Sequence, residues 1–553
     1  MAAVGNRDMI GRRGGLARPG CLPGVSGTTD RPQVGKGHVE ELGGTPMIGA
    51  THGDRGEARG HFLDELRATF AERGGRPALI YRDRTYAFGE LDRRARRCAA
   101  WLRGLGLEKG DRVVLASAEK LPFLAAHLGV LYAGGVSLPL NPRFTREEMR
   151  YFLADSGARV AVVGREQRPV IEGLQSGLPE LAAVVDDADA WEAPEGREHA
   201  PSIAANDPCL ILYSSGTTGR PKGVVHTHAN LASSLRALRD RWRLTPDDVT
   251  VNVLPLFHIH GLSFATQLSL LSGGCMVMED AFHPRRTLEV VGRGTVFMAI
   301  PTFYYAFLDR PEFPEAARHW RNVRLFTCGS APIRPEVLPR LEAILGRPVI
   351  NRYGMTEGHV ITSLPPEGPW PRGSVGLPLD GIEVRVARGD GTPAPADEVG
   401  AVLLRGPNLF RDYWRNPEST RAAFATGWFD TGDLGRLDPA GFLTLVGRKD
   451  DLIITNGFNV YPQVVERVID ACPGVRETAV LGLPDDRRGE RVAAVIVRDD
   501  PALDERRLRA HWSDLLVDYQ RPMEVVFVEA LPRNAMGKVL RRELRDQFAG
   551  PRR

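Results

Sequence analysis

The stretch of sequence that decides the fold is residues 213–223, YSSGTTGRPKG, which combine three glycines, several hydroxyl side chains and one lysine. An apolar run at 208–213 (PCLILY) precedes it and predicts a strand. Residues 226–242 follow and have a helical pattern, with Asn230 as a candidate N-cap. A glycine- and hydroxyl-rich loop between a strand and a helix is typical of a phosphate-binding site, because unobstructed backbone N–H groups converge on phosphate oxygens.

The side chains of this loop supply both hydroxyl groups and a positive charge. The residues expected to surround the phosphates are Ser214, Ser215, Gly216, Thr217, Thr218, Gly219 and Lys222. The Walker loop of nucleotide hydrolases is excluded, since it needs a Ser or Thr directly after its lysine and Gly223 occupies that position. A serine–glycine turn without a ligand explains a shorter fragment better than it explains all eleven residues.

Short apolar runs alternate with helical patterns on both sides of this loop. Residues 88–106 place Leu91, Ala95, Cys98 and Leu102 at helical spacing, and residues 111–117 predict a buried strand. The alternation continues to about residue 356 and predicts layered α/β sheets. After Gly400 the pattern is that of β structure, and after Arg448 that of a compact α+β unit. We therefore expect a disordered extension at 1–60, a large domain at 61–448 and a small C-terminal domain at 449–553.

Composition excludes several classes of function. The chain has 553 residues, 42% of them hydrophobic and 25% charged, with a net charge of +3. This balance gives no reason to expect nucleic acid or an anionic membrane as a partner. The least charged stretches, 121–140 and 251–278, are interrupted by Pro, His and Gly-Gly, so we expect buried helix and strand there and no membrane span. Six dispersed cysteines and no secretory signal favour a reducing compartment, the cytoplasm, and residue Met47 is an alternative start.

Lysine is scarce in this chain. Only six of the 72 basic residues are lysines: Lys36, Lys109, Lys120, Lys222, Lys449 and Lys538. Because lysine is a compact point charge that arginine does not replace, each one is a candidate for a specific role. We expect none for Lys36, Lys109 and Lys120, and we derive none for Lys449.

Four further motifs occur in order along the chain. They are NRYGMTE at 351–357, GWFDTGD at 427–433, GRKDDLIITNGFNVYP at 447–462 and PRNAMGK at 532–538. Together with the loop at 213–223, they resemble the signatures of the adenylate-forming (AMP-binding) superfamily, which includes acyl-CoA synthetases. The resemblance runs from about residue 61 to the C-terminus. It implies a large α/β domain with a β-rich subdomain and a small, mobile α+β C-terminal domain.

The resemblance also implies roles for individual residues, with ATP, Mg²⁺ and coenzyme A as cofactor and co-substrates. Glu357 corresponds to the Mg²⁺ ligand, Thr356 to a donor for the α-phosphate, and Lys538 to the cation between the α-phosphate and the acid. Asp433 and Arg448 correspond to the ribose contacts. The adenine slot corresponds to Gly329, Ser330, Ala331, Asn351, Arg352, Tyr353 and Gly354. Such cations and donors are needed because one anion must approach another.

In this family the acyl group then passes to a thiol after the small domain rotates. Asp450 occupies the hinge position by resemblance, and Gly457 lies in the segment expected to approach the pantetheine. His258, in PLFHIHG at 255–261, corresponds to a residue near the reacting carboxylate, although a buried histidine with one hydrogen bond fits it nearly as well. Amino-acid-activating relatives carry an aspartate after Phe257, so His258 at that position disfavours an amino acid.

The resemblance leaves the acid open. A hydrophobic monocarboxylate, such as a fatty acid, is favoured by residues 455–462. A malonyl-CoA-type dicarboxylate ligase is the alternative, and its second charge would need a cation such as Arg285, Arg286 or Arg352. A luciferase-like oxygenase and a nucleotide-binding pseudoenzyme are alternatives of another class. No carrier segment follows Lys538, which favours CoA as acceptor, and a homodimer is one arrangement that the sequence allows.

Overall fold

A computed structural model describes residues 61–196, 201–214, 220–534 and 537–549. All of them belong to the second of two units into which the chain separates, residues 59–553. The predicted extension at 1–60 and the loop residues 215–219 therefore lie outside the described residues.

The helices begin close to where the sequence periodicity places them. They are α1 (Phe62–Glu72), α2 (Phe88–Gly104), α3 (Lys120–Tyr132), α4 (Arg146–Ser156), α5 (Arg168–Gln175), α6 (Asp187–Trp191), α7 (His228–Trp242), α8 (Leu268–Leu271), α9 (Pro284–Val291), α10 (Pro301–Leu308), α11 (Phe313–Ala317), α12 (Leu338–Leu345), α13 (Pro417–Ala423), α14 (Pro462–Asp470), α15 (Glu505–Trp512) and α16 (Arg541–Phe548). A π-helix spans His260–Gln267, and short 3-10 helices span Lys449–Asp451 and Asp518–Gln520. Helix α2 buries Leu91, Ala95, Cys98 and Leu102, the residues that the sequence places at helical spacing.

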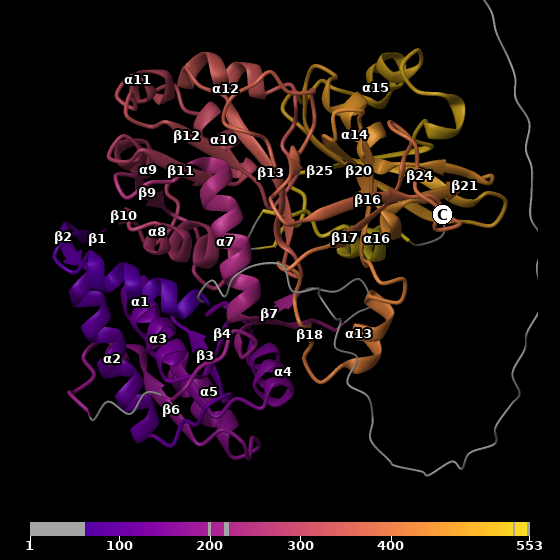
Figure 1. Cartoon of the computed structure of the whole chain (residues 1–553). Coiled ribbons are helices and arrows are strands. Elements are labelled where there is room, and N and C mark those ends of the chain that lie inside the picture. Colours follow the sequence, from indigo (N-terminus) through magenta and orange to yellow (C-terminus); the bar gives the residue numbers. More distant parts are fainter. Residues whose placement is uncertain (1–60, 197–200, 215–219, 535–536, 550–553) are drawn as a thin grey trace, which may run out of the picture. The chain divides into compact units, whose positions relative to one another are not determined.

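A mostly parallel sheet of nine described strands forms one layer, in the order β15-β14-β13-β12-β11-β9-β10-β1-β2. Its strands are β1 (Pro77–Tyr81), β2 (Arg84–Ala87), β9 (Val249–Asn252), β10 (Cys275–Met278), β11 (Val296–Ala299), β12 (Leu325–Cys328), β13 (Val349–Met355), β14 (His359–Ser363) and β15 (Leu377–Pro378). Helices α9, α10, α11 and α12 gather around β9, β11 and β12 (Figure 1). Since β9, β11, β12 and β13 run parallel, their carboxyl ends meet at one edge of the sheet.

A second sheet, of seven described strands, contains the strands on both sides of the predicted phosphate loop. Its order is β18-β8-β7-β4-β3-β5-β6, with β3 (Arg112–Ala116), β4 (Val136–Pro139), β5 (Val160–Val163), β6 (Ala183–Asp186), β7 (Pro208–Ser214), β8 (Lys222–Thr227) and β18 (Asp412–Tyr413). Strands β4 and β5 are buried at every position, as in sheets that helices cover on both faces. Helix α7 contacts both β8 and β14, and so connects the two sheets.

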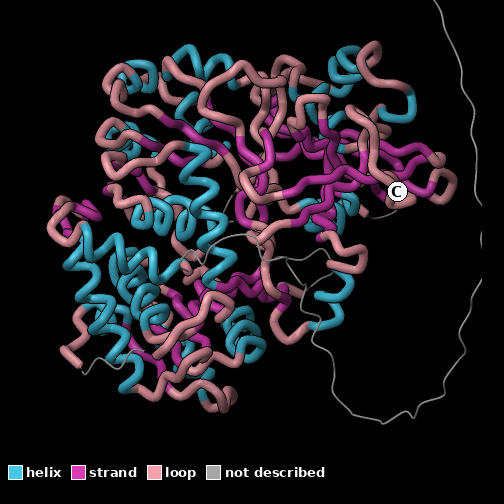
Figure 2. Tube along the Cα trace, viewed as in Figure 1, coloured by secondary structure: helices cyan, strands magenta, loops and turns pink. Residues whose placement is uncertain are grey.

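The remaining strands form two smaller sheets. Strands β16 (Glu383–Ala387), β17 (Gly400–Arg405), β19 (Phe429–Leu437) and β20 (Leu443–Arg448) pair in antiparallel fashion. The C-terminal sheet contains β21 (Ile453–Thr455), β22 (Phe458–Val460), β23 (Val475–Asp485), β24 (Gly489–Arg498) and β25 (Glu524–Val528). Figure 2 shows that strands predominate in this part of the chain. The predicted α/β class, with β structure after Gly400 and α+β structure after Arg448, is confirmed.

Of two local predictions from the sequence, one is confirmed and the other is wrong. The weakly charged stretch 121–140 forms α3 and β4, which are almost wholly buried, as predicted. The predicted N-cap at Asn230 is wrong, because Thr227 caps α7 and Asn230 sits three residues further on. The two side chains form a reciprocal capping box, in which Asn230 Oδ1 accepts from the Thr227 backbone N–H at 3.0 Å.

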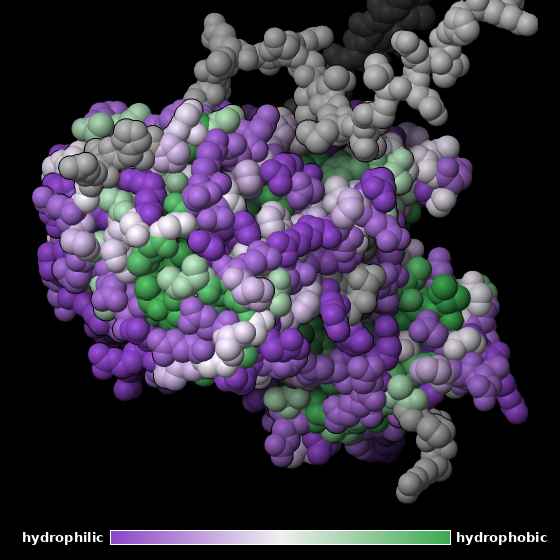
Figure 3. Space-filling model, turned by 90° about the horizontal axis from the view of Figure 1, so that it is seen from below, coloured by the Kyte–Doolittle hydropathy of each residue, from purple (hydrophilic) through white to green (hydrophobic). Residues whose placement is uncertain are grey.

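The surface is largely polar. On the face seen in Figure 3, hydrophilic side chains predominate and apolar ones gather in a few patches. Within the described residues, no helix combines the length and the apolar character needed to cross a membrane. The five cysteines that the structure describes, Cys98, Cys209, Cys275, Cys328 and Cys472, are free.

Candidate active site

A tight turn between β13 and β14 presents Thr356 and Glu357. These antiparallel strands pair Met355 with His359, so only residues 356–358 connect them. Glu357 is 7% exposed, and burial raises its pKa, which hydrogen bonding by Tyr413 and Ser214 opposes. The Tyr413 hydroxyl donates to Glu357 Oε1 at 3.2 Å. The carboxylate therefore lies beside the end of β7, where the phosphate loop begins.

Lys222 belongs to the same cluster. Its Nζ lies 5.2 Å from the centre of the Tyr413 ring, so the ring has a cation on its face and the Glu357 carboxylate at its hydroxyl. Among the described residues, no ion pair neutralises Glu357 and no group of three metal-binding side chains is present. A buried carboxylate without a cation fits Mg²⁺, which takes one or two protein carboxylates and otherwise phosphates and water.

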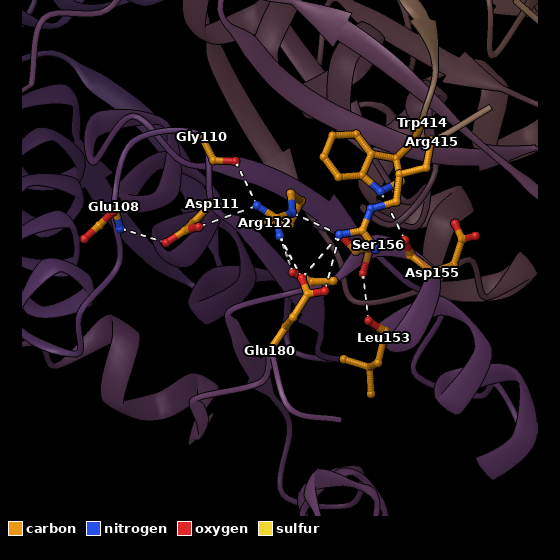
Figure 4. A network of polar contacts seen from close by, with 11 residues as sticks. Glu108, Gly110, Asp111, Arg112, Leu153, Asp155, Ser156, Glu180, Trp414 and Arg415 are labelled. Carbon is orange, nitrogen blue, oxygen red and sulfur yellow. Dashed lines mark hydrogen bonds and ion pairs between the residues drawn. The ribbon is translucent and has the colours of Figure 1, made fainter. Parts of the chain in front are cut away.

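The two residues that follow Tyr413 in the chain, Trp414 and Arg415, belong to a polar network with Arg112, Asp155 and Glu180 (Figure 4). Trp414 Nε1 donates to the Asp155 carbonyl oxygen at 3.1 Å, while Asp155 Oδ2 accepts from the Tyr213 hydroxyl at 2.6 Å. Arg112 and Arg415 both reach Glu180 at 3.3 Å. Such exposed ion pairs add little stability. The position of β18 next to β8 comes from their antiparallel pairing, which sets Tyr413 opposite Val224, two residues after Lys222.

Asp433 and Arg448 face each other across strands β19 and β20. They are register partners, and Arg448 Nη1 lies 3.1 Å from Asp433 Oδ1. The Tyr353 hydroxyl donates to Asp433 Oδ2. Asp433 is 7% exposed, and burial raises its pKa while the charge of Arg448 opposes the shift. Tyr353 and Arg448 come from two separate motifs, and both are predicted to contact the nucleoside. Both of them contact the buried carboxylate of Asp433.

Lys538 lies within electrostatic range of this group. Burial of its ammonium and the charge of Arg448 lower its pKa, whereas Asp433 and Asp451 raise it. The residue as a whole is exposed, and the charges of Arg448, Asp433 and Asp451 act on its ammonium. A Cβ atom on the preceding Gly537 would meet Thr302 at 2.8 Å, so only glycine allows this close approach to α10. The C-terminal turn thus places its cation beside Asp433 and Arg448.

Arg352 lies in a separate, buried environment. Neighbouring residues of a strand face opposite sides, so Arg352 lies across the sheet from Tyr353. Its guanidinium lies 5.2 Å from the Phe264 ring, and its Nη2 is 3.4 Å from Ser330 Oγ. Arg352 is 4% exposed, and burial lowers its pKa to about 10. Within the described part of the chain no carboxylate forms an ion pair with it.

Two histidines border this guanidinium. His260 Nδ1 lies 3.1 Å from Ser330 Oγ, and the His260 backbone N–H donates to His258 Nδ1 at 3.2 Å. Burial lowers the pKa of His258 to about 4 and that of His260 further still, with the charge of Arg352 adding to both shifts. Both imidazoles are therefore neutral at physiological pH. The buried surroundings of Arg352 therefore combine its positive charge with neutral hydrogen-bonding groups.

The other predicted residues are distributed around these groups. Gly329, Ser330 and Ala331 follow β12, and Asn351 and Gly354 belong to β13, so both sets lie at the carboxyl edge of the large sheet. Asp450 is exposed in the 3-10 helix after β20, and Gly457 is at the tip of the β21–β22 hairpin with φ at +78°. Ser215, Gly216, Thr217, Thr218 and Gly219 lie outside the described residues.

Three residues of the site are not apparent from the sequence. Tyr413 lies 56 positions after Glu357, and RDYW at 411–414 resembles no catalytic motif. His226 contacts the turn at Thr356 and His359 contacts His226, but isolated histidines in a sequence most often have a structural role. The weak signal for His226 is its place directly behind the phosphate loop.

Comparison with known proteins agrees with this geometry. Residues 66–414 match the family model of the AMP-binding enzymes, and residues 464–538 match the model of the AMP-binding enzyme C-terminal domain. The chain is 34% identical to the long-chain-fatty-acid–CoA ligase FadD13 of Mycobacterium tuberculosis, over 84% of this chain and 93% of that one. It is 35% identical to an oxalate–CoA ligase of Arabidopsis thaliana, over 80% and 89%.

A solved structure shows the same arrangement. ATP-bound MatB from Rhodopseudomonas palustris superimposes with a TM-score of 0.83 at 37% identity, covering 88% of this chain and 99% of that one. ATP, Mg²⁺ and CoA are the nucleotide, metal and acceptor of such ligases, as the sequence predicts. The chain therefore belongs to the AMP-binding enzyme family and, within it, to the adenylate-forming acid–CoA ligases.

Proposed function

We propose that this acid–CoA ligase activates a short carboxylic acid that carries a second negatively charged group, and that Arg352 binds this group. The observation that supports the proposal is a buried guanidinium without an acidic partner among the described residues. An unpaired buried charge costs several kcal/mol, of the order of the desolvation penalty of an ion. A carboxylate of the substrate would offset that cost, and a bidentate pair would also orient the acid.

The surroundings of Arg352 are suited to a small anion. Ser330 Oγ and the imidazoles of His258 and His260 offer neutral polar groups beside the guanidinium. We assign Arg352 to the acid instead of the adenine, because it and Tyr353 face opposite sides of β13. The 35% identity to an oxalate–CoA ligase supports a dicarboxylate, since oxalate has two carboxylates.

The nucleotide is proposed to occupy the other face of this edge. Asp433, with Arg448 beside it, accepts hydrogen bonds from the ribose hydroxyls, and Tyr353 stacks on the adenine between Asn351 and the segment Gly329–Ala331. Glu357 holds Mg²⁺, which when bound neutralises phosphate charge, and Thr356 donates to the α-phosphate. Ser214 and Lys222 contact the outer phosphates, together with the loop residues 215–219. The cluster of Glu357, Tyr413 and Lys222 supports this placement.

Lys538 is proposed to act between the two reactants. Its ammonium offsets the repulsion between the attacking carboxylate and the α-phosphate, and this leads to an acyl-adenylate and pyrophosphate. The position of its charge beside Asp433 and Arg448 supports the role.

Transfer to CoA is proposed to need a second arrangement of the chain. Residues 61–448 and 449–553 act as separate domains, with Asp450 as the hinge and Gly457 at the pantetheine. The exposed position of Asp450 supports this assignment. The contact between the Arg334 side chain and the Arg476 carbonyl oxygen, at 3.0 Å, would have to break during the rotation.

A hydrophobic monocarboxylate, which the sequence favours, is the second candidate. It is supported by the identity to long-chain-fatty-acid–CoA ligases. In that case Arg352 would contact the reacting carboxylate, and the chain length of the acid would be set by the apolar residues around Phe264. A luciferase-like oxygenase or a pseudoenzyme would not release AMP in a manner dependent on both acid and CoA.

An ATP/pyrophosphate exchange screen tests the proposal. Malonate, succinate, propionate, octanoate and benzoate are supplied singly to the purified enzyme with ATP and Mg²⁺. We expect a short dicarboxylate to support the fastest exchange, by about 10-fold or more over the uncharged analogue of similar length, because one hydrogen-bonded charge pair is worth about 1.5–3 kcal/mol. Faster exchange with octanoate than with any dicarboxylate would contradict the proposal and favour the second candidate.

The cytoplasm is the proposed compartment, supported by the free cysteines and the reducing conditions that they indicate. Fractionation of native cells tests this compartment, and recovery of the protein in a secreted fraction would contradict it.

A homodimer is the proposed assembly. Light scattering on the purified protein tests it, because it gives the mass directly.

A further inference from the structure

We propose that His226 and His359 are positioning residues that hold the turn bearing Thr356 and Glu357 through a chain of hydrogen bonds ending on the Thr356 carbonyl oxygen. The inference rests on the proposed roles of Thr356 and Glu357 at the ATP phosphates. It adds two residues that connect this turn to the strand behind the phosphate loop.

The two rings form a linear chain. His226 Nε2 lies 2.8 Å from the Thr356 carbonyl oxygen, and His359 Nε2 lies 2.9 Å from His226 Nδ1. The ring centroids are 4.2 Å apart, and both side chains are fully buried. His226 is on β8, which starts at Lys222 and follows the phosphate loop directly. The chain thus joins the two elements that would contact opposite ends of the phosphate group.

The donor and acceptor roles in this chain follow from the group at its end, the Thr356 carbonyl oxygen. A carbonyl oxygen has no hydrogen, so His226 Nε2 must donate. Both rings are completely buried, and burial disfavours the charged imidazolium, so each ring is treated as neutral. A neutral His226 with Nε2–H has a lone pair on Nδ1, and His359 Nε2 must donate to it. His359 Nδ1 is then an acceptor, and it has no hydrogen-bond partner in the described structure.

The turn needs such support because its backbone is tight. His359 has φ at +55°, in the left-handed region that residues other than glycine rarely adopt. A Cβ atom on Gly354 would lie 2.2 Å from the His359 carbonyl oxygen, so the strands approach more closely here than other residues allow. Contacts to the ring of His359 therefore oppose relaxation of the turn.

Three successive carbonyl groups of the turn are held from outside. His226 donates to that of Thr356, the Phe410 backbone N–H to that of Glu357 at 2.8 Å, and Asn408 Nδ2 to that of Gly358 at 2.5 Å. The last two donors come from the segment before β18, whereas His226 comes from β8. Loss of the histidine chain would free the turn on the side of the phosphate loop, where small displacements of catalytic groups reduce rates steeply.

The test compares His359→Leu and His226→Leu with the conservative variant His359→Gln in ATP/pyrophosphate exchange. The Gln amide places an N–H near the position of Nε2, so it restores the donor to His226. We expect the Leu variants to lose about 10- to 100-fold in kcat/KM for ATP·Mg²⁺, with KM for the acid nearly unchanged, and His359→Gln to recover most of the loss.

His127→Leu is the matched control, because His127 is also buried and bonded at both ring nitrogens, to Ser137 at 2.8 Å and Gln267 at 2.9 Å. We expect His127→Leu to lose as much thermal stability as the other Leu variants but to keep its kcat/KM for ATP·Mg²⁺. If His359→Leu shows the same loss of thermal stability and the same unchanged kcat/KM as this control, the proposal is overturned. If Glu357→Gln and Thr356→Val leave the exchange intact, the assigned role of the turn fails instead.

A measurement on the unmodified protein covers the case in which the Leu variants do not fold. Nitrogen-15 NMR of histidine-labelled enzyme at pH 7.5 should show both rings as neutral Nε2–H tautomers, assigned by comparison with the His359→Gln spectrum. An imidazolium or an Nδ1–H tautomer at either residue would overturn the proposed chain of donors.

Discussion

Replacing Lys538 by alanine is expected to slow formation of the acyl-adenylate by about 10²- to 10³-fold, while formation of the thioester from supplied acyl-adenylate is largely retained. The reason is that two anions react in the first step only. Lys538 lies beside Asp433 and Arg448, where the nucleotide is proposed to bind. A preorganised cation at this position stabilises charge that develops as the carboxylate meets the α-phosphate, and the second step has no such need.

The two half-reactions are measured separately, by ATP/pyrophosphate exchange and by conversion of synthetic acyl-adenylate to acyl-CoA. Lys109→Ala is the matched control, because Lys109 forms a surface ion pair with Asp207 at 2.6 Å. Lysines are rare in this chain, so both variants remove a scarce residue. Equal losses in the two half-reactions of Lys538→Ala would refute the role assigned to this lysine.

Replacing Arg352 by methionine is expected to reverse the preference of the enzyme for acids. Methionine fills a similar volume without the charge, so a second carboxylate would be buried without a partner. We expect kcat/KM for the preferred dicarboxylate to fall by about 10²-fold or more, and kcat/KM for a monocarboxylate of similar length to stay the same or rise. Initial rates with paired acids, such as malonate and propionate, measure the effect.

Arg285→Met is the matched control for this experiment. The side chain of Arg285 is 80% exposed and faces Glu312 at 3.8 Å, whereas Arg286 pairs with Glu279 at 3.2 Å. Neither is a candidate for binding a buried anion. A uniform loss with every acid in Arg352→Met would mean that Arg352 contacts the reacting carboxylate or supports the fold, and the dicarboxylate proposal would then be wrong.

The fold is accessible from the sequence because its strands are short apolar runs that end in glycine, proline or polar residues. The runs at 160–163, 296–299 and 325–328 form β5, β11 and β12. The π-helix at His260–Gln267 was not predicted, since an apolar run gives no sign of an altered helical repeat. A Cβ atom on Gly261 would meet the Pro255 carbonyl oxygen at 2.2 Å, and such a close approach is a property of the folded chain alone.

Part of the candidate site can be predicted from the sequence. Asp433 and Arg448 belong to separate motifs, and their pairing across β19 and β20 agrees with the shared role that the resemblance implies. The sequence does not distinguish Arg352 from Arg285 and Arg286, because burial depends on the strand and the face on which each one lies. Tyr413 joins the site only because β18 pairs with β8.

The lysines show the same limit. Lys120 has no predicted role, yet it is 3% exposed, and burial lowers its pKa to about 7. Its Nζ donates to the Asn252 carbonyl oxygen at 3.4 Å, at the end of β9. Lys449, for which we derive no role from the sequence, donates from its Nζ to Asp430 Oδ2 at 2.5 Å. The burial of Lys120 and the ion pair of Lys449 both depend on tertiary contacts, which the residue type alone does not reveal.

The most direct test of the account is the detection of an acyl-adenylate by mass spectrometry. The purified enzyme is mixed with ATP, Mg²⁺ and a panel of carboxylic acids, without CoA, and the quenched reaction is searched for each mixed anhydride. The account predicts one acyl-adenylate together with pyrophosphate, and its conversion to acyl-CoA and AMP when CoA is added. Absence of every acyl-adenylate, or products of ADP and phosphate, would contradict the account.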